Sequence, residues 1–314
     1  MYAREWPHMR SCPSIRVWSP AGRSVVHRVI YRRTGPPDDL AAAMTYHPAQ
    51  PLCVLLWQRS GGFEWQPLHR SGIPVTSHSP VTAPLAVRGP MTAPWRAFSE
   101  GEAEELWVWL YPDGVRDALG VEPNACRNRW QPWLPTGKQH FRVDSCGTIF
   151  QSGGTETVCR GLAELLGEPK LRLVPNQRPS SLGEWRKRFQ QSVSQATASR
   201  VKRTAQRLHR QLCGMTALEL DRLTKVDEAL QKLLCGPAPA RGDLGRLACE
   251  FGFCDQSYLI RSVRQATGSS PTELRQGVDG SRSFWSYLGL YTPSVGLAAA
   301  VDANSSRLTV EASA

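Results

Sequence analysis

The 314-residue sequence lacks the patterns of a membrane protein and of a disulfide-rich secreted protein. No apolar run approaches the ~18 residues of a membrane span, and no signal-peptide pattern opens the chain. The nine cysteines are scattered without a Cys-x-x-Cys pair. This usage is typical of a reducing compartment, so we expect a cytoplasmic protein with no membrane partner.

Motifs that carry common enzyme chemistry are also missing. The seven histidines are dispersed, without His-x-His or His-Glu-x-x-His spacing: His8, His27, His47, His69, His78, His140 and His209. Neither a phosphate-binding loop, nor a Gly-x-Ser-x-Gly motif, nor a dinucleotide-binding glycine pattern occurs. The sequence therefore predicts no catalytic residue, no metal ligand and no cofactor.

Lysine is scarce, because only six of the 38 basic residues are Lys, and the net charge is +11. A basic balance suits a polyanionic partner. Residues 181–214 contain eight Arg or Lys residues against the single acid Glu184. Arginine suits phosphate and guanine contacts, although GC-rich coding accounts for the same bias.

The clearest pattern lies in residues 244–275, which predict two short helices joined by a tight turn. The first helix has an i, i+3, i+4, i+7 apolar stripe and ends at Gly252: Leu244, Leu247, Ala248 and Phe251. Asp255 then caps a second helix that buries Leu259, Val263 and Ala266 and ends at Gly268. Ser270-Pro271 starts a further helix with Glu273 in its first turn. Such a helix pair is typical of DNA binding, with the second helix in the major groove.

This segment resembles the second helix-turn-helix of AraC/XylS-type bacterial transcription regulators. The resemblance is carried by Gly252, Phe253, Asp255, Gln256, Ser257, Tyr258, Leu259 and Arg261, then Gly268, Ser270, Pro271 and Arg275. It implies a sequence-specific DNA-binding transcription regulator that is not an enzyme. The alternative for this segment is a generic helical hairpin without a DNA role.

A second part of the chain resembles the first helix-turn-helix of the same family. Residues 203–216 are similar to its recognition helix and exit, and residues 216–234 would form the helix that links the two units. His209 stands where the family favours a buried Phe, and Ala205 where it favours Leu. Whether this first unit still binds DNA is left open.

The buried positions of the second recognition helix fix which residues face outwards. We expect base-edge contacts from Gln256, Ser257, Ile260 and Arg261, with Arg264 at a phosphate. Gln pairs with adenine, Arg with guanine, and Ile meets a thymine methyl group. The matching face of the first unit is Arg203, Gln206 and Arg207. The alternative for each basic residue is a solvated surface charge.

The part before the helices has a β-like pattern. Residues 51–57 and 105–111 are predicted as buried strands, and Pro112-Asp113 as the start of a short helix that Gly120 ends. The Gly89-Pro-x-Thr-x-Pro element feeds a further strand and resembles the sensor-like domain of one AraC-type subgroup. That resemblance implies a cupin-like or related fold that binds an effector or mediates dimers. Five tryptophans between Trp57 and Trp109 would line a sensor cavity or, as we expect, pack as a core.

The expected fold is α+β, with an N-terminal mixed β-rich domain and a C-terminal all-α domain that holds two helix-turn-helix units. We expect residues 1–43 to be a disordered arm or sequence upstream of the true start, and residues 44–166 to be a sensor or dimerisation domain that ends in a connecting helix at 155–166. A linker in 167–180 would lead to the DNA-binding domain in 181–291, with helix-turn-helix units at about 181–214 and 243–275. Residues 292–314 would be a disordered tail. Phe284, Trp285 and Tyr287 would anchor against the helical domain.

The resemblance also implies the partners: double-stranded DNA, RNA polymerase, a small-molecule effector and a second copy of the chain. Two alternatives remain. One is an AraC-type DNA-binding domain fused to a catalytic or DNA-repair domain, although Cys146 and Cys159 lack the pattern of an activated cysteine. The other is a non-specific basic protein that binds nucleic acid, which leaves the exposed Gln, Ser and Arg positions unexplained.

Overall fold

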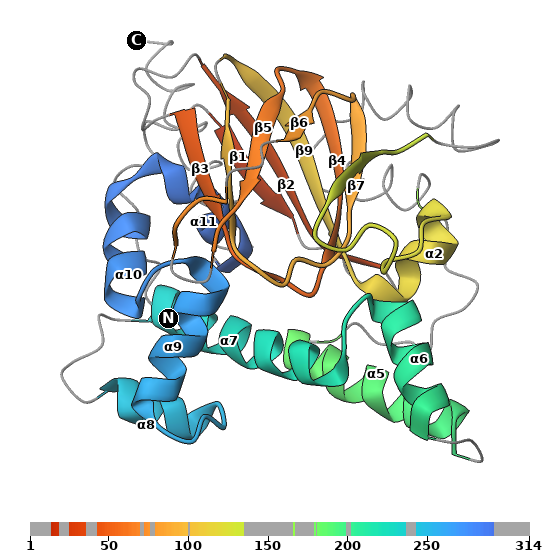
Figure 1. Cartoon of the computed structure of the whole chain (residues 1–314). Helices are drawn as coiled ribbons and strands as arrows, with labels where there is room; N and C mark the ends of the chain where they lie inside the picture. The colour runs from red at the N-terminus through yellow and green to blue at the C-terminus, as the bar shows by residue number, and fades with distance from the viewer. Residues whose placement is uncertain are drawn as a thin grey trace, which may run out of the picture.

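The computed structural model has a β-rich part above an all-helical part (Figure 1). It describes residues 14–18, 25–35, 43–69, 72–75, 79–99, 101–134, 166, 179, 181–198, 202–236 and 243–291. Among the described elements, the strands fall in the first 134 residues and, apart from the short α2 (Pro112–Leu119), the helices follow from Leu182 onwards. The predicted α+β fold class is therefore confirmed.

Six antiparallel strands form the larger sheet in the order β1-β2-β9-β4-β7-β10. These are β1 (Ser14–Trp18), β2 (Val26–Thr34), β4 (Cys53–Ser60), β7 (Leu85–Arg88), β9 (Ala103–Leu110) and β10 (Trp130–Pro132). The two predicted buried strands fall in β4 and β9. Strand β9 is buried on both faces, because Trp107 and Trp109 belong to one core cluster and Leu106 and Val108 to another.

A smaller antiparallel sheet packs on one face of the larger one. Its order is β3-β8-β5-β6, with β3 (Met44–His47), β5 (Phe63–Pro67), β6 (Ser79–Val81) and β8 (Trp95–Phe98). The ring of Trp107 on β9 lies 6.3 Å from that of Trp95 and 5.8 Å from that of Phe63. Four of the five tryptophans expected to form a core, Trp65, Trp95, Trp107 and Trp109, thus pack in one aromatic interior between the sheets, whereas Trp57 is half-buried against the other core cluster.

Helix α2 (Pro112–Leu119) covers the opposite face of the larger sheet. Its residues Val115 and Ala118 pack with Leu55 and Val87 of the strands. Proline stands at its start, and Gly120 ends it in the left-handed conformation with φ 70°. Both predicted ends of this helix are confirmed.

The expectation of a disordered arm over residues 1–43 is wrong for β2. This strand pairs with β9 from Val26 to Thr34, and Val29 and Ile30 are fully buried. A register shift between Val26 and Arg28 breaks the alternation of apolar and polar residues. The period-2 signal of a strand is therefore absent from the sequence, although the strand belongs to the sheet.

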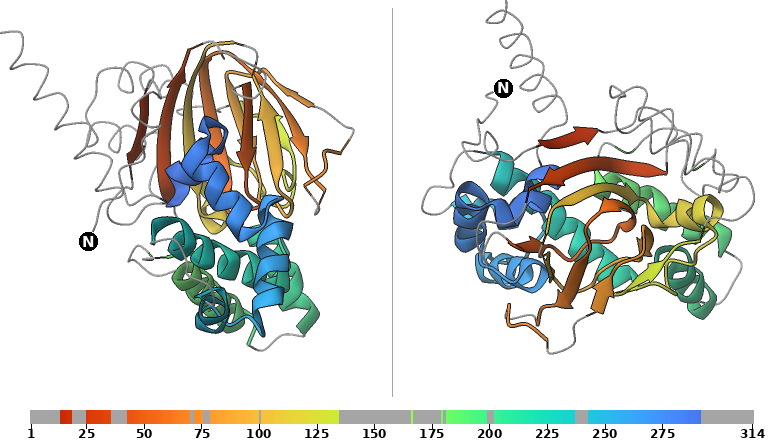
Figure 2. Two further views of the ribbon diagram at one scale, coloured as in Figure 1. Left: turned by 90° about the vertical axis from the view of Figure 1, so that its left-hand side faces the viewer. Right: turned by 90° about the horizontal axis from the view of Figure 1, so that it is seen from above.

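The helical part is organised around α7, which lies below the sheets (Figure 2). Its members are α5 (Leu182–Ala196), α6 (Lys202–Cys213), α7 (Ala217–Cys235), α8 (Asp243–Glu250), α9 (Gln256–Thr267), α10 (Pro271–Gly280), the 3-10 turn η2 (Arg282–Phe284) and α11 (Trp285–Tyr291). In Figure 1, α5 and α6 lie towards one end of α7, and α8 and α9 towards the other. None of the described helices is long and apolar enough to cross a membrane. Apart from Leu166 and Pro179, the expected connecting helix, linker and tail lie outside the described residues.

The aromatic anchor before the tail packs differently from the expectation. Trp285 is 1% exposed, and its ring lies edge-on at 5.4 Å from Trp107 and 5.5 Å from His47. The Ser286 hydroxyl donates to the Tyr46 carbonyl at 2.7 Å. The prediction that this anchor packs against the helical domain is therefore wrong for Trp285, which enters the aromatic interior of the sheets.

Candidate nucleic-acid interface

The second helix-turn-helix unit, α8 and α9, has the predicted turn chemistry. Gly252 takes the left-handed conformation at φ 70°, and Gly268 ends α9 at φ 80°. The Asp255 carboxylate accepts a hydrogen bond from the Tyr258 backbone N–H at 2.6 Å, which holds the pKa of this carboxyl below its usual range. Ser270 and Glu273 form a reciprocal capping box at the start of α10. These contacts fix both ends of α9 independently of what it binds.

One face of α9 is free of packing. Leu259 and Val263 are buried, whereas four of the five residues predicted on this helix are exposed: Gln256, Ser257, Arg261 and Arg264. Ile260 is half-buried. An Arg264 guanidinium nitrogen lies 3.2 Å from Glu273, so a phosphate at Arg264 would have to compete with that carboxylate.

Sequence reasoning missed Tyr258 as part of this face. Its side chain is 41% exposed, and the Arg261 guanidinium lies 6.0 Å from the centre of its ring. A cation over an aromatic ring is attracted by the negative face of the ring. Tyr258 and Arg261 are three residues apart, and this i, i+3 spacing was the available signal.

The first unit, α5 and α6, also exposes its predicted residues, but into different surroundings. Arg203, Gln206 and Arg207 lie on the exposed side of α6. They line a cavity of about 710 Å³ together with Arg210, Gln211 and three residues of the β-rich part: Glu122, Asn124 and Ala125. The face of α6 therefore lies partly opposite a loop of the β-rich part.

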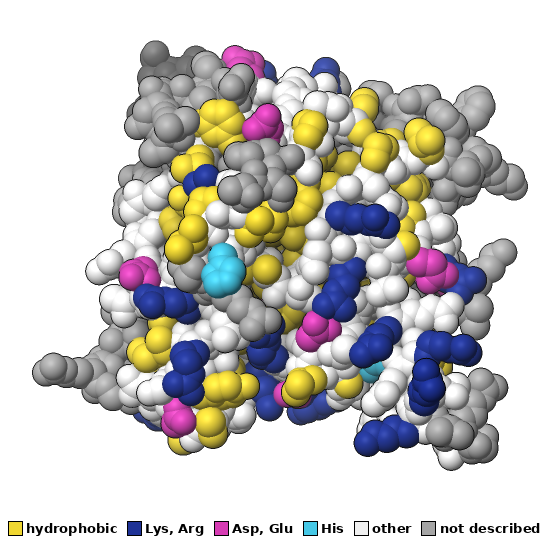
Figure 3. Space-filling view, viewed as in Figure 1, with side chains coloured by type: hydrophobic (Ala, Val, Ile, Leu, Met, Phe, Trp, Pro, Cys, Tyr) yellow, Lys and Arg dark blue, Asp and Glu magenta, His cyan; other side chains and the backbone are white. Residues whose placement is uncertain are grey.

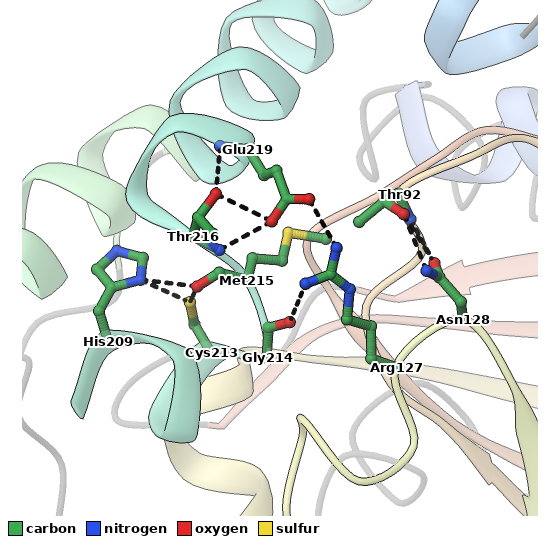
Figure 4. Close-up of polar contacts among 9 residues, drawn as sticks. All are labelled: Thr92, Arg127, Asn128, His209, Cys213, Gly214, Met215, Thr216 and Glu219. Carbon is green, nitrogen blue, oxygen red and sulfur yellow. Dashed lines mark hydrogen bonds and ion pairs between the residues drawn. The ribbon is translucent and has the colours of Figure 1, made fainter. Parts of the chain in front are cut away.

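An arginine of the same loop holds the turn between α6 and α7 (Figure 4). Arg127 donates to the Gly214 carbonyl at 3.3 Å and to the Glu219 carboxylate at 2.6 Å. Gly214 has φ 70°, and a Cβ there would lie 2.9 Å from the Pro90 side chain and 3.0 Å from the Pro123 carbonyl. Only glycine fits this turn, because both its backbone conformation and its neighbours exclude a side chain.

His209 explains how α6 departs from the family pattern without losing its packing. The imidazole is buried against the Phe189 ring, with 5.1 Å between ring centres, and Nδ1 lies 2.9 Å from the Met215 carbonyl. Burial lowers the pKa of His209, while the bond to Met215 opposes this shift. The neutral imidazole donating to Met215 thus takes the place of a buried phenylalanine.

We expect His209→Phe to change the pH dependence of stability more than stability itself. At pH 8 the free energy of unfolding should stay within about 1 kcal/mol of the wild type, since one hydrogen bond is exchanged for apolar packing. Because the folded-state pKa is lowered, the wild type loses stability as the pH falls below the unfolded value of about 6.5. Urea unfolding at pH 8 and pH 5.5 checks this; equal acid sensitivity of both proteins would contradict it.

Exposed basic side chains gather near both recognition helices. Figure 3 shows dark blue side chains at the lower right and lower left, over the regions that hold α6 and α8–α9 in Figure 1. The exposed arginines of these helices are Arg203, Arg207, Arg210, Arg246, Arg261 and Arg264. Among the described residues, no cluster of three or more His, Cys, Asp or Glu side chains could hold a metal ion.

Comparison with known proteins matches residues 196–277 to the family model described as helix-turn-helix domain. No curated protein sequence matches the chain. Among solved structures, ToxT from Vibrio cholerae O395 is similar at 9% identity, with 80% of this chain and 98% of that chain covered and a TM-score of 0.40. The AraC-like transcriptional activator CuxR is similar at 14% identity, with 70% and 83% covered and a TM-score of 0.31. Oxalate decarboxylase from Bacillus subtilis covers 40% of this chain and 41% of its own, at 12% identity and a TM-score of 0.22.

Proposed function

We propose that this chain is a DNA-binding transcription regulator of the AraC type that reads one asymmetric DNA site with both recognition helices, and the match of residues 196–277 to a helix-turn-helix domain supports this proposal. In this proposal α9 and α6 enter successive major grooves of the duplex. The base-edge contacts of α9 come from Gln256, Ser257, Ile260 and Arg261, and Arg264 contacts a phosphate. The base-edge contacts of α6 come from Arg203, Gln206 and Arg207. The exposed polar face of α9 is the single observation that carries this proposal.

The length of α7 supports two grooves on one face of the DNA. Its 19 residues span about 28 Å at 1.5 Å per residue. Two half-sites one helical turn apart are separated by about 34–36 Å. Helices placed towards the two ends of α7 are therefore separated by a distance of the right order.

The two recognition helices should contribute unequally. The α9 face is exposed, whereas the α6 face lines a cavity against residues 122–125. A helix in the major groove must approach bases about 8.5 Å below the groove edge. The loop wall restricts that approach for α6, so α9 carries most of the base reading in this arrangement.

The remaining expectations follow from the same role. A small-molecule effector, a second copy of the chain and RNA polymerase are proposed partners of such a regulator. A protein that reads bacterial DNA works in the cytoplasm and needs no catalytic step of its own. The competing role, non-specific binding of nucleic acid, differs in its response to competitor DNA.

The test is a fluorescence-anisotropy titration against DNA upstream of the protein's own gene, with excess random DNA present and a salt series alongside. We expect saturable binding that resists the competitor, and a footprint of two protected stretches one helical turn apart. Binding that random DNA abolishes at every salt concentration would favour the non-specific role. Absence of binding at low salt would contradict DNA recognition altogether.

Arg127→Met should tighten binding to the specific site by about 2- to 5-fold, because it removes a partly exposed ion pair that holds the loop beside α6. Arg129→Met is the matched control: Arg129 lies on the same loop and, among the described residues, donates only to the Ala125 carbonyl of that loop. The dissociation constants of both variants are measured on the footprinted fragment. An unchanged constant for Arg127→Met would mean that the loop does not restrict α6.

A further inference from the structure

The cavity of about 710 Å³ beside α6 lies between the recognition face of that helix and the loop at residues 122–125. Its volume falls within the range of about 300–1,000 Å³ that is typical of small-molecule sites. One of its walls is the face proposed to read DNA, because Arg203, Gln206 and Arg207 line it. A molecule held in this cavity would therefore occupy the side chains that the proposed DNA contacts of α6 require.

The cavity gathers three arginines on one helix face. Arg203, Arg207 and Arg210 follow the i, i+4, i+7 spacing, which places side chains in one row along a helix. Within the described part of the chain, none of these three arginines has a carboxylate within ion-pair distance. Glu122 lines the opposite wall, and it already pairs with Arg116 at 3.1 Å. The row of arginines is thus a positively charged wall that suits an anion.

The loop that forms the opposite wall is held by contacts away from the cavity (Figure 4). Arg127 donates to the Gly214 carbonyl at 3.3 Å and to the Glu219 carboxylate at 2.6 Å. The Asn128 side-chain oxygen accepts the Thr92 backbone N–H at 2.7 Å. These contacts fix the loop relative to α6 without a ligand, and a preformed site lowers the entropic cost of binding one.

The remaining side chains of the lining indicate what else the ligand carries. Asn124, Gln206 and Gln211 supply amide groups, each of which both donates and accepts hydrogen bonds. Amides of this kind pair with hydroxyl groups, whereas guanidinium groups bind phosphate oxygens in pairs. Among the described residues that line the cavity none is aromatic, so a nucleobase would find no ring to stack on. The lining is therefore complementary to a hydroxyl-rich molecule that carries phosphate.

We propose that this cavity binds a small hydroxyl-rich bisphosphate, and that the bound ligand excludes DNA from α6. The exclusion rests on the proposed DNA-reading role of α6. Arg203 and Arg210 are separated by about 10 Å along the helix axis, at 1.5 Å per residue, so the two phosphate groups bind at the two ends of the row. Each phosphate brings about 1.5–2 negative charges at pH 7, and two of them balance three arginines. Gln206 lies between these ends, where the hydroxyl groups of the ligand would be.

The first test measures binding by the full chain without DNA, so it does not depend on the proposed function. The probe is fructose 1,6-bisphosphate, with fructose as its uncharged counterpart and inorganic phosphate as the bare anion. We expect calorimetry to detect one saturable site that binds the bisphosphate at least about 10-fold more tightly than inorganic phosphate, because its two phosphates bind together. No binding of the bisphosphate, or equal binding of fructose or inorganic phosphate, would overturn the proposal.

Arg207→Met locates the site within the chain. It should weaken bisphosphate binding by about 10-fold or more, because it removes a charged hydrogen-bond donor from the middle of the row. Arg246→Met is the matched control, since Arg246 is exposed on α8 and lies outside the cavity lining. Both arginines are exposed, so neither substitution should prevent folding. Equal affinity of Arg207→Met and the wild type would place the site elsewhere and overturn the proposal.

The second test adds the footprinted DNA fragment. Saturating bisphosphate should remove the protected stretch contacted by α6 and leave that of α9, because the cavity is lined by residues of α6. Inorganic phosphate at equal ionic strength controls for screening of the DNA phosphates. Persistence of both stretches would overturn the exclusion of DNA. A chain that binds the bisphosphate but no DNA would contradict the proposed function and still support the ligand site, so the two failures are distinguishable.

Discussion

Arg261→Ala is expected to weaken binding to the specific DNA site by about 5- to 150-fold. A bidentate arginine contact to guanine is worth about 1–3 kcal/mol of discrimination, and 1.4 kcal/mol is tenfold in affinity. Arg261 is exposed on α9, three residues after the exposed Tyr258, whose ring its guanidinium approaches at 6.0 Å. Anisotropy titrations on the specific fragment and on random DNA measure the ratio of the two affinities.

The control for Arg261 is Arg264→Ala, one turn further along the same helix. Arg264 is already paired with Glu273, and we expect it to contact a phosphate. Its loss should weaken specific and random DNA about equally and should reduce the salt dependence of binding. A ratio of specific to random affinity that Arg261→Ala leaves unchanged would contradict the base contact assigned to Arg261, but not the helix-turn-helix match of residues 196–277.

Trp285→Ala is expected to cost about 3–5 kcal/mol in the free energy of unfolding. Large-to-small changes at fully buried aromatic positions lose transfer free energy and leave a cavity. The substitution also removes contacts between the two parts of the chain. The Trp285 ring lies against Trp107 and His47 of the β-rich part, while its helix, α11, belongs to the helical part. Urea unfolding followed by tryptophan fluorescence and by circular dichroism measures the effect.

The two optical signals separate a local defect from a loss of coupling between the parts. If Trp285 couples the sheets to the helices, the fluorescence and circular dichroism transitions of Trp285→Ala should no longer coincide. Leu218→Ala serves as a control, because Leu218 is 79% exposed and its loss should stay within about 0.5 kcal/mol. A loss below 1 kcal/mol for Trp285→Ala, with coincident transitions, would mean that this contact is dispensable.

The second helix-turn-helix unit could be predicted because its signals are local. The cap at Asp255, the left-handed glycines at 252 and 268 and the capping box at Ser270 each act within a few residues. The 3.6-residue periodicity of Leu259, Val263 and Ala266 then fixes which face is free. The same logic located α2. The long α7 was instead expected from the resemblance to the family, and the structure adds that its Thr216 and Glu219 form a capping box.

Long-range pairing was beyond such reasoning. Strand β2 is held by β9, 79 residues later in the chain for Val29 and Val108, and its bulge removes the alternation that would have marked it. Trp285 fills a ring cluster made by strands 178 residues earlier at Trp107, so its packing partner could not be read from its neighbours. Nor does the motif around Arg203 indicate that a loop at 122–125 faces it.

By itself, then, the sequence determined the helix ends, the periodicity and the exposed polar face of α9, because caps, glycines and helical spacing act within one or two turns. Only the tertiary structure decided what lies opposite each face. It set the α6 residues beside the loop at 122–125 and gave the buried Arg32 a carboxylate partner, Glu105. Those outcomes depend on which distant segments the two sheets bring together. A buried charge stabilises or destabilises the fold according to the partner it meets there, and no local sequence pattern shows that partner.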